Sequence, residues 1–348
     1  MKTFSERILS LIWCFLIFYS PNSYAEGIEN KKLVAYVGGV NELVKIDVEN
    51  HKIVKRLRFP RGGHIVFGLD ISPDGNKIYA TGDMFSAPMI QIDSKTLEIA
   101  KSLPEKGFEE TKIGGKFGNF GCRGKVSPDG NTLVLDCGTD SAPFAIIDMQ
   151  TFKIINHLSF SSNPIYEAVF SDDDKLLYVL TGIQVKQKKL LFENKIITID
   201  SETGKILKEF SLPKFGNIKC QTNISEYTGE NSNIFIACYR NFYDSHGSES
   251  RGLLKGDEIY PFISTSDLKR VKLIEVKTGK IISDIPIPEG RGQLNLAVLT
   301  PDTKTLLICR GSYSHPGELT VIDVKSKKIV KRIMLEGGAT SNVVFGYE

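Results

Sequence analysis

One short pattern recurs six times along this chain of 348 residues: an isoleucine followed by an acidic residue at the end of an apolar run. The six acids are Asp47, Asp93, Asp148, Asp200, Glu275 and Asp323. Successive acids are separated by 46, 55, 52, 75 and 48 residues. Repetition at this period is typical of chains that fold as propellers or as open solenoids.

A second pattern alternates with the first and predicts tight turns. It reads Ser-Pro-Asp-Gly at residues 72–75 and 127–130, and it recurs in weaker form at 171–174 and 300–303. Proline presets φ, aspartate bonds its own backbone and glycine accepts a positive φ, so each segment predicts a strand, a turn and a strand. With the Ile-Asp strand and the Lys-rich strand after it, one repeat contains four antiparallel strands.

Repeated four-stranded sheets of this period predict an all-β fold, a β-propeller. We count six blades. Residues 33–37, 43–47 and 53–58 supply three strands at the start of the chain, and residues 341–345 supply a fourth at its end. We therefore expect the two ends to share one blade and close the ring; an open solenoid is the alternative. The whole of residues 26–348 then forms a single domain.

The first 25 residues have the composition of an export signal. Lys2 and Arg7 precede a mostly apolar run at 8–19, and Ser23 and Ala25 stand at alternate positions before the expected cleavage site. The apolar run is shorter than the ~20 residues that span a bilayer, so an uncleaved anchor is the weaker alternative. We expect an exported protein without a membrane span, in the periplasm or an equivalent compartment.

Long connections are expected on one face of the ring, the face that carries the links between blades. They fall at residues 82–89, 105–121, 182–195, 240–269 and 310–318. Long connections on one side of a repeat protein usually mark its binding face, although tolerated surface insertion is the alternative. We predict that the insertion at about 240–270 faces a partner and is not a seventh blade, because it lacks both repeated patterns. Its expected partner-binding residues are Phe242, Tyr243, Asp244, His246, Glu249, Arg251, Asp257, Glu258 and Tyr260.

Five cysteines follow the expected signal. In the hairpin around residues 128–130, Cys122 is expected to face Cys137, and in the hairpin around residue 229, Cys220 is expected to face Cys238. Facing residues lie ~4.5–5.5 Å apart, within reach of a disulfide. We predict two disulfides, with buried thiols as the alternative, and we expect Cys309 to keep its thiol.

Motifs for chemistry are sparse. The sequence contains no Cys-x-x-Cys-His for covalent haem and no zinc-protease or nucleophile-elbow motif, so we predict no catalytic residue. His64, His246 and His315 are weak metal candidates on the loop-rich face, without ligand spacing. The formal charge of +3 argues against a nucleic acid held by bulk charge.

The run Tyr-Ala-Thr-Gly at 79–82, the Ile-Asp segments and the Ser-Pro-Asp-Gly turns resemble the YVTN-type propeller family, which includes the β subunits of quinohaemoprotein amine dehydrogenases. The resemblance covers residues 31–348, although such propellers usually have seven blades. An exported, Lys-rich, solitary propeller also resembles the β subunits of hydrazine synthases from anaerobic ammonium oxidisers.

These resemblances imply a non-catalytic scaffold subunit of a multi-subunit redox enzyme in nitrogen metabolism. They further imply multihaem cytochrome-type partner chains that carry haem c, and location in the anammoxosome if the hydrazine synthase resemblance holds. A lactonase-like or metal-dependent propeller hydrolase and a cell-envelope interaction module are the alternative functions. Fold alone does not choose among the three.

Overall fold

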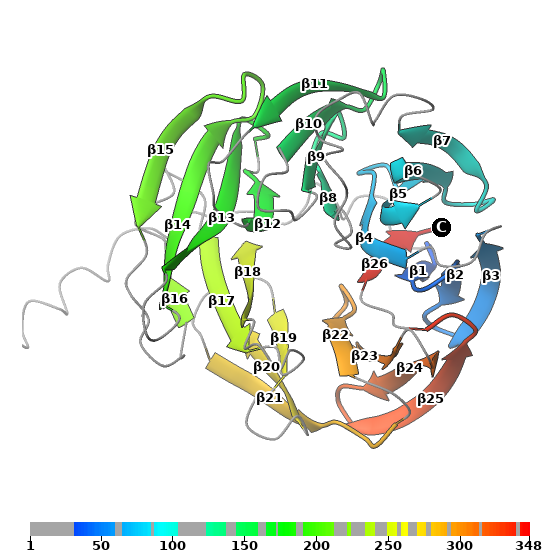
Figure 1. Cartoon of the computed structure of the whole chain (residues 1–348). Helices are drawn as coiled ribbons and strands as arrows, with labels where there is room; N and C mark the ends of the chain where they lie inside the picture. Colours follow the sequence, from blue (N-terminus) through cyan, green and yellow to red (C-terminus); the bar gives the residue numbers. More distant parts are fainter. Residues whose placement is uncertain are drawn as a thin grey trace, which may run out of the picture.

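The protein is a β-propeller whose sheets are arranged around a ring (Figure 1). The computed structural model describes residues 31–59, 65–84, 87–103, 123–136, 144–158, 165–171, 173–185, 191–211, 221–223, 234–240, 249–255, 259–263, 270–275, 280–290, 294–312, 315–338 and 342–348. The predicted signal peptide and the connection at 105–121 lie outside these residues. No helix long and apolar enough to cross a bilayer occurs in the described part of the chain.

Five of the sheets have four antiparallel strands. Blade 1 contains β26 (Asn342–Tyr347), β1 (Leu33–Gly38), β2 (Glu42–Asp47) and β3 (Lys52–Arg58). Blade 2 contains β4 (Ile65–Ile71), β5 (Lys77–Met84), β6 (Ala87–Asp93) and β7 (Ile99–Leu103). Blade 3 contains β8 (Arg123–Val126), β9 (Thr132–Asp136), β10 (Phe144–Asp148) and β11 (Lys153–Leu158). Blade 4 contains β12 (Ile165–Phe170), β13 (Leu176–Val185), β14 (Leu191–Asp200) and β15 (Ile206–Ser211). Blade 7 contains β22 (Leu294–Leu299), β23 (Thr305–Ser312), β24 (His315–Asp323) and β25 (Lys328–Leu335).

Two three-stranded sheets complete the ring. Blade 5 contains β16 (Gln221–Asn223), β17 (Ile234–Arg240) and β18 (Glu249–Lys255). Blade 6 contains β19 (Ile259–Ile263), β20 (Arg270–Glu275) and β21 (Lys280–Pro286). The described residues thus form seven sheets, and the count of six is wrong. The interval between Asp200 and Glu275 holds a sheet without the Ile-Asp pattern, because backbone pairing requires strands but not that signature.

The chain ends close the ring as the sequence predicts. Strand β26 pairs with β1 over six residue pairs, from Leu33 with Tyr347 to Gly38 with Asn342. The amide of Glu348 donates to the carbonyl of Lys32 at 2.9 Å, and the amide of Lys32 donates back at 2.6 Å. A shared blade leaves no open sheet edge at the junction of the two ends.

The Ser-Pro-Asp-Gly segments form the predicted turns. In each turn the serine or threonine oxygen accepts a backbone amide five residues later, at 2.9 Å for Ser72, Ser127 and Ser171 and 3.0 Å for Thr300. The same hydroxyl donates to the aspartate two residues later. Gly75 and Gly130 adopt φ of 73° and 77°, the conformation that glycine accepts without strain.

The core lies between neighbouring blades. Both faces of the middle strands are covered, so β2 is buried at every position, including the charged residues Glu42 and Lys45. The outermost strand β3 has only exposed and half-buried residues. Tyr36 and Tyr79 are the largest fully buried side chains. Burial of each aromatic or aliphatic side chain contributes about 1.5–3 kcal/mol, and this packing holds the ring together.

Candidate functional site

The face predicted to bind partners carries β-hairpins in place of several predicted loops. Residues 82–89 lie within the β5–β6 hairpin, whose last pair is Met84 with Ala87. The connection at 310–318 is likewise a hairpin, in which Ser312 of β23 pairs with His315 of β24. These segments are therefore paired strands, and the prediction of loops is wrong there.

The β13–β14 hairpin extends beyond both strands described next to it. Its ladder continues from Leu176 with Asp200 to Val185 with Leu191. The neighbour β12 stops pairing at Thr181, and β15 stops at Lys195. Four residue pairs, from Gly182 with Asn194 to Val185 with Leu191, therefore have no strand on either side among the residues that the structure describes. A two-stranded ribbon is marginally stable by itself.

The predicted partner-facing insertion contributes strands to two blades. Glu249 and Arg251 lie in β18, where they pair with Arg240 and Cys238 of β17. Tyr260 lies in β19 and pairs with Ile274 of β20. The prediction that this segment stands outside the blades is wrong for these residues. The other expected contacts lie outside the described residues: Phe242, Tyr243, Asp244, His246, Asp257 and Glu258.

The metal candidates are not assembled by the described structure. His315 lies at the start of β24, whereas His64 and His246 fall outside the described residues. Within the described ranges, no group of three histidine, cysteine or acidic side chains could hold a metal ion. Arg310, on the same face, donates from Nη2 to the carbonyl of Pro288 at 2.9 Å.

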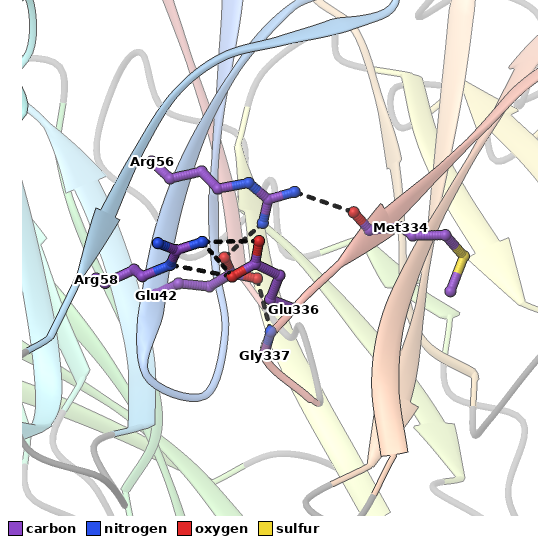
Figure 2. A network of polar contacts seen from close by, with 6 residues as sticks. All are labelled: Glu42, Arg56, Arg58, Met334, Glu336 and Gly337. Carbon is purple, nitrogen blue, oxygen red and sulfur yellow. Dashed lines mark hydrogen bonds and ion pairs between the residues drawn. The ribbon is translucent and has the colours of Figure 1, made fainter.

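A buried ionic joint connects blades 1 and 7, and the sequence patterns do not predict it (Figure 2). Glu42, with a side chain 4% exposed, accepts Arg56 Nη1 at 2.6 Å through Oε2. Its other oxygen accepts the amide of Gly337 at 2.7 Å, just after β25. Arg56 Nη2 also donates to the carbonyl of Met334 at 3.2 Å. At the surface, Arg58 binds both carboxylate oxygens of Glu336.

The same joint recurs between blades 7 and 6. Arg332 Nη1 binds Glu318 Oε1 at 2.5 Å, and its Nη2 donates to the carbonyl of Glu289. In blade 6 the charges are exchanged, because Arg270 begins β20 and Asp284 lies on β21, with Nε and Oδ1 2.7 Å apart. Opposite charges fourteen residues apart at one repeat position are the sequence signal for these joints.

The repeated Ile-Asp acids have a structural role. Each of the five aspartates among them closes the turn after its strand by accepting the backbone amide three residues later, as Asp93 does from Thr96 at 2.7 Å and Asp148 from Thr151 at 2.6 Å. These amide hydrogen bonds hold the pKa of Asp93 and Asp148 below the usual value. A hydrogen bond from Thr203 lowers the pKa of Asp200 in the same way. These aspartates therefore act as hydrogen-bond acceptors that hold the turns.

A buried lysine anchors the closing blade. Lys45 Nζ forms an ion pair with the carboxylate of Glu348 and donates to the carbonyl of Ser94 at 3.0 Å. The Tyr36 hydroxyl donates to the same carbonyl at 3.1 Å, and its ring centroid lies 5.7 Å from Lys45 Nζ. Burial, reinforced by the charge of Glu348, raises the pKa of Tyr36 to about 12. This network joins the last residue of the chain to blade 2.

The predicted hairpin registers are confirmed for the residues next to the cysteines. Arg123, which follows Cys122, pairs with Asp136, which precedes Cys137. Gln221, which follows Cys220, pairs with Ala237, which precedes Cys238. Cys122, Cys137 and Cys220 lie outside the described residues, so both disulfides stay predictions. Cys309 is a buried thiol, as expected.

Comparisons with known proteins identify no family for this chain. No known family profile matches the chain, and no curated protein matches it. The dihydro-heme d1 dehydrogenase NirN in complex with DHE is similar at a TM-score of 0.49 and 13% identity, over 94% of this chain and 77% of that one. A protein of unknown function from Bacteroides caccae is similar at a TM-score of 0.45 and 12% identity, over 90% of this chain and 99% of that one. At these values neither structure indicates what this chain does.

Proposed function

We propose that this chain is an exported, non-catalytic β-propeller that serves as a docking scaffold for partner subunits. The observation that carries the proposal is the β13–β14 hairpin, four of whose residue pairs extend past both neighbouring strands. A rigid propeller holds such a ribbon in a fixed direction, and a partner surface supplies the packing that the described lengths of β12 and β15 do not reach.

The proposal on the identity of the partners rests on the sequence resemblance. We propose that the partners are subunits of a redox enzyme of the hydrazine synthase kind. These partner chains carry haem c. Phe242, Tyr243 and the neighbouring predicted residues are proposed as further contacts. Deleting residues 245–258 is a poor test of these contacts because it removes β18. Serine substitutions at Phe242 and Tyr243 test them without loss of a strand.

The main test shortens the hairpin and examines assembly in the native source. Residues 182–194 are replaced by Asn-Gly, so that the paired residues Thr181 and Lys195 flank a two-residue turn. In the control, Phe85 and Ser86 become Asn-Gly between the paired residues Met84 and Ala87, which changes turn chemistry on the same face without shortening a ribbon.

Untagged purification should recover the wild type and the control with the same partner chains, which haem absorbance then identifies. The shortened variant should remain folded and be recovered without them. Equal recovery of partners with the shortened variant would overturn docking through the hairpin. Recovery of the wild type as a solitary chain would overturn the scaffold proposal itself.

A further inference from the structure

Positive charge is concentrated on two neighbouring outermost strands. Strand β3 contains four basic residues and β25 contains three, and neither contains an acid. By contrast, β7 and β11 contain one lysine each, whereas β15 and β21 each contain one lysine and one acid. The formal charge of the whole chain is only +3, so this surplus is local.

The acids near these strands form ion pairs with the three arginines. Four lysines of the two strands remain without such a pair in the described structure. Buried Glu42 and Glu318 bind Arg56 and Arg332, and exposed Glu336 binds Arg58. Within the described part of the chain no acid forms an ion pair with the remaining basic residues of the two strands. These residues are Lys52, Lys55, Lys328 and Lys331, and all four are exposed.

Apolar side chains lie among the lysines. Val54 on β3 is 55% exposed, and Ile329 and Val330 on β25 are 43% and 47% exposed. Both strands are the last in their sheets, so one backbone edge of each has no strand partner among the described residues. Arg58 at the end of β3 binds Glu336 just after β25, so this pair joins the two blades where the two strands end (Figure 2).

We propose that the surface formed by β3 and β25 binds an acidic, extended segment of a partner protein. The segment adds as a strand to the edge of β25 or β3. Open backbone edges provide hydrogen bonds, exposed lysines select glutamate or aspartate, and the apolar side chains pack against alternate residues of the added strand. The proposal is independent of the hairpin, which extends from blade 4.

Protection of edge strands is the competing explanation, because lysines on an edge oppose unwanted pairing. It does not account for the distribution. Strands β15 and β21 have equally exposed apolar side chains, with Leu207 51% and Ile282 46% exposed. Both strands are also sheet edges, yet each has balanced charge. The surplus on β3 and β25 therefore exceeds what edge protection requires.

The test uses a synthetic peptide that alternates glutamate and valine over eight residues, the length of β25. The charge-reversal variant is Lys52→Glu with Lys328→Glu. The matched control is Lys153→Glu with Lys205→Glu, because these lysines occupy the same repeat position in blades 3 and 4 and change the net charge equally. Binding is measured by titration at low and high salt, and thermal melting verifies that each variant is folded.

Wild type and control should bind the peptide alike, and the charge-reversal variant should bind it roughly tenfold or more weakly. A peptide with lysine in place of glutamate should not bind. Absent binding to the wild type, or equal weakening in both variants, would overturn the proposal. Binding to vesicles rich in phosphatidylserine without binding to the peptide would also overturn it, in favour of a membrane surface. Aggregation of the charge-reversal variant, with no peptide binding by the wild type, would assign the lysines to edge protection alone.

Discussion

The ammonium group of Lys45 and the carboxylate of Glu348, 303 residues apart, form an ion pair where the two ends of the chain meet. Lys45 is almost fully buried, with 4% of its side chain exposed, whereas Glu348 is 30% exposed. The pair therefore compensates a charge that β2 places in the interior. Charge compensation at this position therefore accompanies the strand pairing that closes the ring.

Glu348→Gln should destabilise the protein by about 2 kcal/mol, because a buried ammonium loses its counter-charge while burial is retained. The measurement is the denaturant midpoint at neutral pH. Lys175→Gln serves as the control, since the Lys175–Asp173 pair is exposed on both sides, and it should change stability by less than about 0.5 kcal/mol. Equal effects of the two substitutions would contradict a role for the buried pair.

Glu42→Ala should destabilise by about 3 kcal/mol, because it leaves Arg56 and the Gly337 amide without their shared acceptor at the joint between blades 1 and 7. Arg58→Ala removes the exposed Arg58–Glu336 pair at the same joint and should cost at most about 1 kcal/mol. A double-mutant cycle of Glu42 and Arg56 should show coupling. Additive losses in that cycle would mean that the ion pair contributes nothing.

Stability should fall in acid because the turn aspartates are hydrogen-bonded as anions. In the folded protein the pKa values of Asp93, Asp148 and Asp200 are lower than the ordinary 3.8. The unfolded chain therefore takes up protons first, so the stabilisation is complete above pH 3.8 and is lost as the pH falls through the folded values. Urea midpoints between pH 7 and pH 2 measure this dependence.

Asp148→Ala removes one of these carboxylates. It should make the stability depend less on pH in acid, and it should lower the stability at pH 7. A variant whose midpoints retain the full acid dependence of the wild type would show that this turn does not contribute to it.

Alkylation of the unfolded but unreduced mature protein should modify one cysteine, Cys309. The described registers end at Arg123 with Asp136 and at Gln221 with Ala237, one residue short of the two predicted cysteine pairs, so continued pairing would bring each pair within disulfide reach. Reduction should then expose four more thiols and lower the melting temperature, since each disulfide typically contributes about 2–4 kcal/mol. Mass spectrometry counts the labels; five labels before reduction would exclude both disulfides.

Sequence alone determined the elements that depend on local chemistry. The Ser-Pro-Asp-Gly turns, the antiparallel strands around them and the closing blade were predicted, and so were the registers next to Cys122 and Cys220. In the Ser-Pro-Asp-Gly hairpins, the turn residues fix which positions face one another. A repeated turn within an alternating apolar pattern is sufficient to specify these features.

Tertiary structure decided the rest, because those features depend on contacts between blades. Residues 201–274 contain no complete repeat, so only pairing showed that β18 and β19 belong to two separate sheets. The β13–β14 extension became visible only where β12 and β15 end. From the sequence alone, Glu42 and Lys45 are ordinary polar residues of a strand. Ring closure buries them, and burial of a charge requires the partners that Arg56 and Glu348 supply.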